Sequence, residues 1–429
     1  MFRSKSKVRV IAVTLLVVLL ASCAGPAAPG GGGVTATPAT PVTPAAPAPA
    51  AAVPVPPPER EPIEGALPSP TPEFLTEWGR ATLDNYLPVD EIIRRAMLEE
   101  GPLVVYTPSS RTWEVSEAFM EAFPGLEVET HNISTTELVE RFSREHDAGL
   151  RIADVVHVGD TDGSIWVEFV HGGRLHIYWP YDIVPYLIPD LAVSQMPMHV
   201  EIMAWFYNDV LFPDGSPITS WWDLTDPMWY GNLVSRHPLE HVQTLVNFVV
   251  PVYHHELMAQ DYERVFGRPI ELSPGAANAG YEWLRRIFAQ NIIFLNSSAD
   301  ISTSVANAEH PMLGLAASSG LRRIDDGLTF NITTELTPYT AIANINAIYV
   351  TEEANNPYTA KLYIRFMTDY HGTGFAPFDT LGGWPSRTDL AGHPGNVPME
   401  DIALWPVNFE WVYFNTPRIA DYIRLLLVQ

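Results

Sequence analysis

Residues 100–111 read EGPLVVYTPSSR, and this stretch contains the end of a helix, a strand and a turn in direct succession. Glu100 and Gly101 end a helical segment, and residues 103–106 form a short apolar run of the strand type. Residues 107–110 form a turn rich in proline and serine, after which a second helix begins. A buried strand that is joined to helices on both sides is typical of a parallel sheet covered by helices. The stretch therefore predicts an α/β fold.

The alternation of helix and strand continues on both sides of this stretch. Residues 91–100 form an amphipathic helix, and the helix after the turn reaches about residue 123. Residues 126–130 alternate in polarity, and Ser134-Thr135-Thr136-Glu137 matches a capping box at the start of the next helix. Residues 153–158 form a third strand. Because helices connect these strands, we expect the strands to lie parallel in one sheet.

Polar residues follow all three strands. Ser109 and Ser110 follow the first, Ser134 and Thr135 follow the second, and Asp160 follows the third. Ligands of such sheets bind at the carboxyl ends of the strands, where helix N-termini and hydroxyl groups donate hydrogen bonds to anions. These turns therefore predict a site for a small, oxyanion-bearing molecule. The alternatives are that the serines only cap their helices and that Asp160 only forms a turn.

The second half of the chain contains more aromatic residues and fewer clear strands. Its predicted strands span residues 232–235, 312–317 and 341–350, and its predicted helices span residues 239–258, 281–290 and 357–369.

Two serines and two arginines extend the predicted binding site. Ser318 and Ser319 follow the strand at residues 312–317, and Arg322 lies one helical turn beyond Ser318. Arg111 likewise follows the serines of the first turn. The fork-shaped guanidinium group suits a carboxylate or a phosphonate, which agrees with an oxyanion ligand.

The N-terminus carries the features of an export signal. Arg3, Lys5, Lys7 and Arg9 precede an apolar run at residues 10–20. This run is too short to span a bilayer comfortably, and it has the pattern of a secretory signal peptide.

The apolar run ends in Leu20-Ala21-Ser22-Cys23, which resembles the lipobox of bacterial lipoproteins. The resemblance implies that residues 1–22 are a signal peptide and that Cys23, the only cysteine, carries the lipid. Residues 23–72 are rich in alanine, proline and glycine, and they predict an extended tether. We therefore expect a lipid-anchored protein at the cell membrane that faces the periplasm or the extracellular space. The alternative is an ordinary secretory peptide with an incidental cysteine.

The composition excludes several classes of partner and site. The chain has 25 Lys and Arg against 50 Asp and Glu, which gives a net charge of −25. Removal of residues 1–22, with four basic and no acidic residues, leaves 21 basic against 50 acidic residues, or −29. We therefore expect no nucleic-acid partner, because its phosphates would be repelled. A single cysteine excludes an internal disulfide framework and a multi-cysteine zinc site.

Six short segments, taken in order, resemble the extracellular solute-binding proteins of ATP-driven (ABC-type) importers, in particular their ferric-iron-type branch. They are EGPLVVY at residues 100–106, WFYN at 205–208, SWWDL at 220–224, DPMWYG at 226–231, NPYTAK at 356–361 and GWPSR at 383–387. The resemblance covers about residues 91–390.

The resemblance implies a two-lobed periplasmic-binding-protein type II fold, in which crossing hinge strands join two α/β lobes around a ligand. Within a solute-binding region at residues 73–429, lobe one would span about residues 91–198 and 339–382. Lobe two would span about residues 199–338 plus the C-terminal tail. The resemblance also implies a monomer without enzymatic activity or cofactor that delivers a small solute to ABC permease subunits. A sensing module that passes ligand occupancy to a signalling partner is the alternative.

Iron is not the expected ligand. The resemblance implies that iron-binding members coordinate Fe(III) with a histidine, a glutamate and two consecutive tyrosines. The corresponding positions in this sequence are Ser110, Gly159 and the pair Ser318-Ser319. Because none of these ligands is retained, we expect no metal site of that kind.

A zinc-dependent hydrolase is a minor alternative. His237, Glu240 and His241 match H-x-x-E-H, the inverted zincin motif, in which two histidines of one helix bind zinc. Pro238 favours a helix that begins at this point, which leaves His237 at its cap.

Overall fold

The computed structural model describes residues 76–84, 86–192, 195–307, 309–368 and 373–428. The predicted signal peptide, Cys23 and the tether lie outside these residues. In the part of the chain that is described, no helix is both long enough and apolar enough to cross a membrane.

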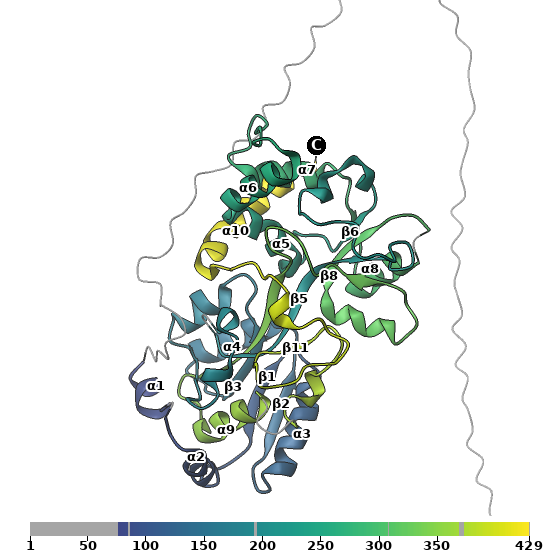
Figure 1. The fold of residues 1–429 in the computed structure, drawn as a ribbon. Helices are drawn as coiled ribbons and strands as arrows, with labels where there is room; N and C mark the ends of the chain where they lie inside the picture. Colours follow the sequence, from purple (N-terminus) through teal and green to yellow (C-terminus); the bar gives the residue numbers. More distant parts are fainter. Residues whose placement is uncertain (1–75, 85, 193–194, 308, 369–372, 429) are drawn as a thin grey trace, which may run out of the picture. The chain divides into compact units, whose positions relative to one another are not determined.

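Strands from both halves of the chain form one mixed sheet (Figure 1). Its main path has the order β2-β1-β3-β10-β5-β8-β6-β7. β1 pairs in parallel with β2 and β3, which confirms the predicted arrangement of the first three strands. The strands are β1 (Leu103–Thr107), β2 (Val128–Asn132), β3 (Val155–Gly159), β4 (Leu175–His176), β5 (Pro197–Tyr207), β6 (Leu233–Ser235), β7 (Ile293–Phe294), β8 (Leu313–Ala317), β9 (Asn331–Ile332), β10 (Ile342–Thr351) and β11 (Trp384–Pro385).

Helices connect most of these strands. The α-helices of the described residues are α1 (Glu77–Thr82), α2 (Val89–Ala96), α3 (Thr112–Ala122), α4 (Thr135–Asp147), α5 (Val242–Tyr253), α6 (His255–Phe266), α7 (Ala279–Phe288), α8 (Ser298–Ala306), α9 (Pro357–Met367) and α10 (Phe409–Leu426). A π-helix, η1 (Ile165–Val170), follows β3. The 3₁₀-helices are η2 (Val184–Tyr186), η3 (Pro189–Leu191), η4 (Asp223–Thr225), η5 (Pro227–Trp229), η6 (Ser318–Ile324), η7 (Ala376–Phe378) and η8 (Met399–Asp401).

β5 and β10 connect the two halves of the sheet. β10 pairs antiparallel with β3 through residues 346–350 and with β5 through residues 342–347. β5 continues past this pairing and pairs antiparallel with β8 through residues 203–207. Each of these two strands therefore has one end in each half of the sheet, as the crossing strands of the predicted fold require.

The buried apolar residues form clusters at both ends of the sheet. The first cluster takes its members from residues 83–198 and 347–378. Two further clusters contain alternate residues of β5, and one of them includes the buried Trp221, Trp222 and Trp283. We call the part around the first cluster lobe one and the part around the other two lobe two. Each lobe has its own core, so the lobes can move relative to each other without unpacking either core.

Two predicted helices differ from the structure. The helix predicted at residues 239–258 is divided into α5 and α6, because the backbone leaves the helical conformation at His254. Nε2 of His254 lies 2.7 Å from the carbonyl oxygen of Pro406, which fixes this residue. The helix predicted at residues 91–100 ends at Ala96. Glu99 leaves the helix and accepts hydrogen bonds from the first amides of α9, a helix whose N-cap residue forms no capping bond.

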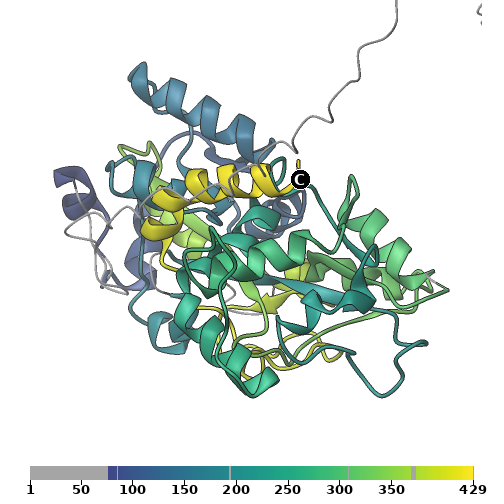
Figure 2. The ribbon, with the colours of Figure 1, turned by 90° about the horizontal axis from the view of Figure 1, so that it is seen from above.

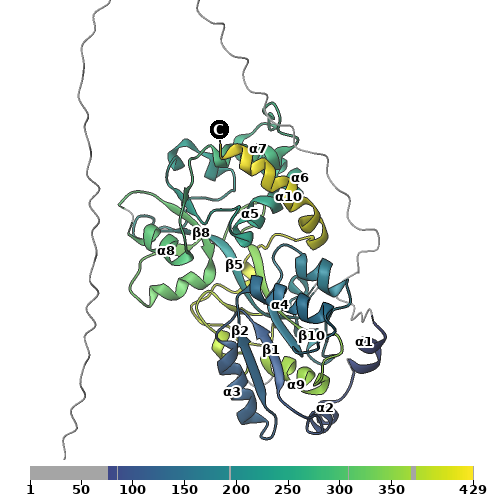
Figure 3. The same ribbon diagram turned by 180° about the vertical axis from the view of Figure 1, so that it is seen from behind.

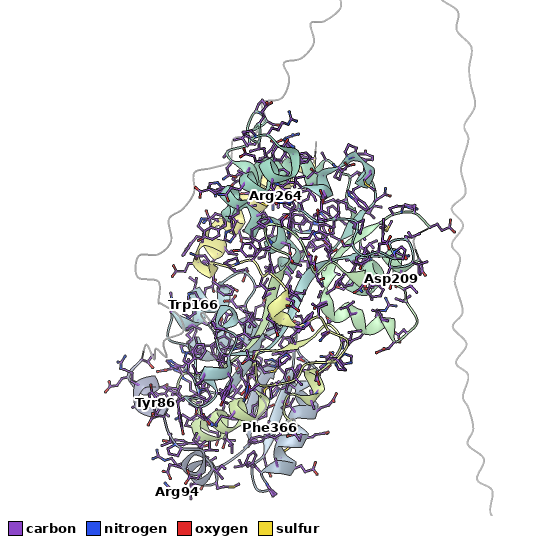
Figure 4. The ribbon with its side chains drawn as sticks, viewed as in Figure 1. Tyr86, Arg94, Trp166, Asp209, Arg264 and Phe366 are labelled. Atoms are coloured by element: carbon purple, nitrogen blue, oxygen red, sulfur yellow. The ribbon has the colours of Figure 1, made fainter. Side chains whose placement is uncertain are left out.

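The C-terminal helix α10 lies in a region for which the sequence predicts no role. It packs against α5 and α7 of lobe two (Figures 2 and 3) and contacts η1 of lobe one, the helix of the labelled Trp166 in Figure 4. The Tyr413 hydroxyl donates a hydrogen bond to Glu168 at 2.7 Å, and Nδ1 of His171 lies 3.7 Å from the buried Glu410 carboxylate. α10 is therefore a third connection between the lobes, in addition to β5 and β10.

Candidate functional site

A cavity of about 780 Å³ lies between the lobes, and we call it the cleft cavity. Lobe one contributes the turns after β1, β2 and β3, which include Thr135, Gly159 and Asp162. Lobe two contributes the turn before α5 with Glu240, and β10 contributes Asn344. The cleft cavity thus lies at the carboxyl ends of β1, β2 and β3, where such sheets bind their ligands.

A buried histidine holds the turn after β1. Nδ1 of His157, on β3, lies 3.1 Å from Thr107 Oγ1 and 3.2 Å from Thr112 Oγ1. Thr107 Oγ1 also accepts a hydrogen bond from the Ser109 amide at 3.1 Å. Burial lowers the pKa of His157 to about 3, so its ring is neutral near pH 7. The turn that carries Ser109, half-buried, and Ser110, exposed, is therefore fixed from within lobe one.

The turn after β2 contains one helix cap and one cavity residue. Ser134 Oγ accepts a hydrogen bond from the Glu137 amide at 3.2 Å, which confirms the start of α4 that the capping box predicts. Thr135, the next residue, lines the cleft cavity. The Ser134 hydroxyl therefore acts as a cap, and the next residue, Thr135, lines the cavity.

The two aspartates of the turn after β3 have different surroundings. Asp160 is 4% exposed, and its two oxygens accept hydrogen bonds from the amides of Gly163 at 2.9 Å and Trp166 at 2.8 Å. Burial raises the pKa of Asp160 to about 7, and the charge of Asp162 contributes to this shift. Asp160 therefore holds η1. Asp162 lines the cleft cavity, and its Oδ1 accepts hydrogen bonds from the amide of Ser164 at 3.1 Å and from its hydroxyl at 2.7 Å.

The two serines after β8 have different surroundings. Ser318 is 0% exposed, and its Oγ accepts a hydrogen bond from the Ile202 amide at 2.9 Å and donates one to the Gly382 carbonyl at 2.6 Å. Ser319 is half-buried, and its hydroxyl lies near enough to the Glu201 carboxylate to oppose the rise of the Glu201 pKa that burial causes. Because the Ser318 hydroxyl is fully used inside the protein, Ser319 is the candidate for ligand contact.

Replacing Ser318 with alanine is expected to lower the free energy of unfolding by about 1–3 kcal/mol, because the buried Ile202 amide loses its acceptor. Urea unfolding followed by tryptophan fluorescence measures this loss. Ser319→Ala is the matched control, with an expected loss below about 1 kcal/mol. Equal losses in the two variants would show that the environments of the two serines do not differ as described.

Two arginines, one from each lobe, lie close enough for the charge of one to affect the pKa of the other. Burial lowers the pKa of the Arg111 guanidinium, and the nearby positive charge of Arg322 lowers it further, whereas Glu201 and Glu114 raise it. Nη1 of Arg111 lies 3.5 Å from the hydroxyl oxygen of Thr380. Nε of Arg322 donates a hydrogen bond to the Ser319 carbonyl oxygen at 2.9 Å. Among the described residues, neither arginine forms an ion pair with a carboxylate within 4.0 Å. The two guanidinium groups are therefore not neutralised by a direct ion pair, although Glu201 and Glu114 lie near enough to affect the pKa of Arg111.

Several polar residues on the crossing strands are missing from the sequence prediction. Glu201 lies opposite Asn344, and His199 lies opposite Asn346, so all four share one face of the sheet. Burial raises the pKa of Glu201, and the Ser319 hydroxyl and both arginines oppose that shift. Polar residues at alternate positions in otherwise apolar strands are the sequence signal that indicates such a face.

The H-x-x-E-H motif does not lie on a helix. Residues 237–241 form a turn, and α5 begins only at Val242, so the helix start expected at Pro238 is wrong. His241 provides the N-cap, since its Nδ1 accepts a hydrogen bond from the Thr244 amide at 3.3 Å. The two histidines therefore lack the arrangement that the inverted zincin motif needs. Across the ranges that the structure describes, no group of three or more His, Cys, Asp or Glu is placed to hold a metal ion.

Comparisons with known proteins give structural matches only. No protein-family model matches the sequence, and no curated protein matches it. Iron-bound HitA from Pseudomonas aeruginosa is 15% identical with a TM-score of 0.56, over 76% of this chain and 99% of that chain. The apo ferric ion-binding protein A of Pasteurella haemolytica is 13% identical with a TM-score of 0.58, over 76% and 98% of the two chains.

A third match has a different ligand. The periplasmic binding protein AfuA from Actinobacillus pleuropneumoniae, with fructose 6-phosphate bound, is 15% identical with a TM-score of 0.52, over 76% of this chain and 97% of that chain. The matches extend over almost the full length of each of these binding proteins, and they agree with the strand order and the two crossing strands described above. The chain therefore has the two-lobed α/β fold of the type II periplasmic binding proteins.

Proposed function

We propose that this chain is an extracytoplasmic solute-binding protein that captures a small organic oxyanion between its lobes and delivers it to the permease of an ABC importer. Cys23 carries the lipid that anchors the protein to the membrane, residues 23–72 form the tether, and the protein acts as a monomer. The carrying observation is that Arg111 and Arg322, one from each lobe, lie near each other without a direct ion pair in a strongly acidic chain.

The surroundings of the arginines suit an oxyanion. Ser109, Ser110 and Ser319 lie on the same turns as the two guanidinium groups and supply further hydrogen-bond donors. Glu201 lies near the Ser319 hydroxyl and both arginines, and burial raises its pKa while these groups oppose the rise. A carboxylate or phosphate bound here would thus contact two guanidinium groups and several hydroxyl groups at a partly desolvated site.

The dimensions of the cleft cavity favour an organic solute over a bare metal ion. About 780 Å³ is in the usual range for small-molecule sites. Hydroxyl and amide side chains line it beside the carboxylates of Glu140, Asp162 and Glu240. Hydroxyl and amide groups hydrogen-bond to organic solutes, whereas Fe(III) requires several hard anionic oxygen ligands around one point. HitA is iron-bound and AfuA holds a sugar phosphate, so this fold accommodates both kinds of cargo. Among the residues that the structure describes, no group of three or more His, Cys, Asp or Glu is placed to hold a metal ion, which supports the organic choice.

Capture follows from the way the lobes are connected. β5 and β10 join the lobes and allow hinge closure, and a solute that contacts both lobes stabilises the closed state by its additional contacts. Arg111 belongs to lobe one and Arg322 to lobe two, so an anion between them is such a solute.

A thermal-shift screen of the purified full-length chain tests this function. We expect a rise in melting temperature with at least one of inorganic phosphate, citrate and fructose 6-phosphate, because a ligand that binds only the native state stabilises it. In Arg111→Gln and Arg322→Gln the affinity for that anion should fall by about 10–100-fold. Arg268→Gln, an exposed arginine beyond α6, is the matched control and should leave the affinity unchanged. A stabilisation by Fe(III) alone, or one that is equal in all variants, would refute the proposal.

A further inference from the structure

We propose that the captured solute has a polyhydroxylated body, as in a sugar acid or a sugar phosphate, and that Asn344 and Asn346 accept hydrogen bonds from its hydroxyl groups in the floor of the cleft cavity. This inference rests on the proposed function and names the chemical class of its solute. It is carried by the positions of the two asparagine side chains and by the contrast between a neutral floor and an acidic, exposed rim.

Two amide oxygens converge at the carboxyl end of β3. Asn344 is 7% exposed and Asn346 is half-buried, and both line the cleft cavity together with Gly159. A Cβ atom added to Gly159 would lie 3.3 Å from Oδ1 of Asn344 and 3.7 Å from Oδ1 of Asn346. Because glycine has no side chain, the space in front of both oxygens belongs to the cavity, where a solute can donate hydrogen bonds to them.

Neighbouring side chains hold both amides in this orientation. The Thr161 hydroxyl donates a hydrogen bond to Oδ1 of Asn344 at 3.4 Å, and Nδ2 of Asn346 lies 3.2 Å from Nε2 of His199. His199 is 4% exposed, and burial lowers its pKa well below its usual range, so its ring is neutral near pH 7. An amide oxygen can accept two hydrogen bonds, so Asn344 can accept one from a solute in addition to the one from Thr161.

Charged side chains of the cavity lie toward the solvent, away from this floor. Glu140 and Glu240 line the cavity but are exposed, and Asp162 is half-buried with one oxygen already used by Ser164. Burial lowers the pKa of His241, another lining residue, to about 4, so its ring is neutral near pH 7. Among the described residues, no lysine or arginine lines the cavity.

Hydroxyl groups match this floor better than charged groups do. A carboxylate or phosphate would meet the acceptor oxygens of Asn344 and Asn346 without a cationic partner, so the oxyanion end of the solute lies outside the cavity. An amine would lose its hydration in the floor while the exposed carboxylates stay at the rim. A hydroxyl group donates to an amide oxygen without burying a charge. The hydroxyl groups of Thr135, Thr136 and Ser164 line the same cavity and can bond to further hydroxyl groups of such a solute.

Calorimetric titration of the purified full-length chain with matched anions tests this inference. Sorbitol 6-phosphate is paired with hexyl phosphate, glycerol 3-phosphate with propyl phosphate, and gluconate with hexanoate. The members of each pair have the same anionic group and chain length, and they differ in their hydroxyl groups. We expect the hydroxylated member of at least one pair to bind about tenfold more tightly than its partner, as two additional neutral hydrogen bonds provide.

Variants assign this preference to the floor of the cavity. In the double variant Asn344→Ala, Asn346→Ala the ratio of the two affinities should fall to about one, because both acceptors are removed. Gly159→Ala, whose methyl group would lie against the same amide oxygens, should lower the ratio independently. Asn307→Ala, at an exposed asparagine after α8, is the matched control and should keep it.

Two results separate this inference from the proposed function. Equal binding within every pair by the unaltered protein, or a preference that persists in both floor variants, would overturn the inference and leave the proposed function intact. The absence of binding by every one of these anions would instead contradict the proposed function, and this inference with it.

Discussion

Replacing Gly163 with alanine is expected to destabilise the protein by about 3 kcal/mol. Gly163 has φ +83°, a conformation that costs a residue with a Cβ atom about 1–2 kcal/mol. Its added Cβ would also lie 2.2 Å from the carbonyl oxygen of Phe409, a backbone atom at the start of α10, and relief of this overlap costs a further 1–3 kcal/mol, roughly. Urea unfolding measures the total loss of stability from these two effects. Because Asp162 and Ser164, the neighbours of Gly163, line the cleft cavity, the change should also weaken solute binding.

Gly149→Ala is the matched control for this substitution. Gly149 has φ +74°, and no atom lies within 4 Å of the place of an added Cβ, so only the backbone penalty of about 1 kcal/mol applies. The difference between the two variants isolates the contact between α10 and the turn after β3. If both variants lost the same stability, the close packing of α10 against this turn would be disproved.

A decrease of pH is expected to destabilise the protein through His157. Burial lowers its pKa in the folded protein to about 3, whereas the unfolded chain takes up the proton near pH 6.5. Between these values only the unfolded state binds the proton, so the stability due to the neutral ring is lost as the pH falls. The expected loss is about 1.4 kcal/mol per pH unit, or about 3 kcal/mol between pH 6.5 and pH 4.

The variant His157→Gln removes this contribution, whatever its effect on stability at neutral pH. The measurement is the free energy of unfolding in urea at a series of pH values, and the slope between pH 6.5 and 4 should be smaller in the variant. Asp160, whose raised pKa acts in the opposite direction, is present in both proteins and cancels in the comparison. His310→Gln, at an exposed histidine, should keep the original slope. A slope that does not change in His157→Gln would mean that the ring is protonated in the folded state.

Local sequence signals predicted the features that neighbouring residues decide. The capping box at Ser134 begins α4, and the apolar runs at residues 103–106 and 312–317 become β1 and β8. Each of these features depends on hydrogen bonds or side-chain periodicity within one segment. The order of such segments was sufficient to predict an α/β fold.

Tertiary contacts decided the roles that the sequence left open. Ser318 and Ser319 are equivalent in local pattern, and they differ only because Ile202 and Gly382, from distant segments, enclose one hydroxyl. The position of Glu201 opposite Asn344 likewise depends on strand pairing. The division of residues 239–258 at His254 depends on the carbonyl oxygen of Pro406, which is 152 positions further along the chain. Contacts between such distant positions cannot be recognised from a single sequence.

Closure of the lobes on an oxyanion can be measured as a change in the distance between spin labels on the two lobes. The labels are attached at Glu117→Cys on α3 and Glu263→Cys on α6, both exposed, in a chain with the substitution Cys23→Ser. We expect the distance distribution to become shorter on addition of phosphate, citrate, fructose 6-phosphate or sorbitol 6-phosphate, and to stay unchanged in Arg111→Gln. A distribution that none of these anions changes, or a change that persists in Arg111→Gln, would contradict capture of an oxyanion between the lobes.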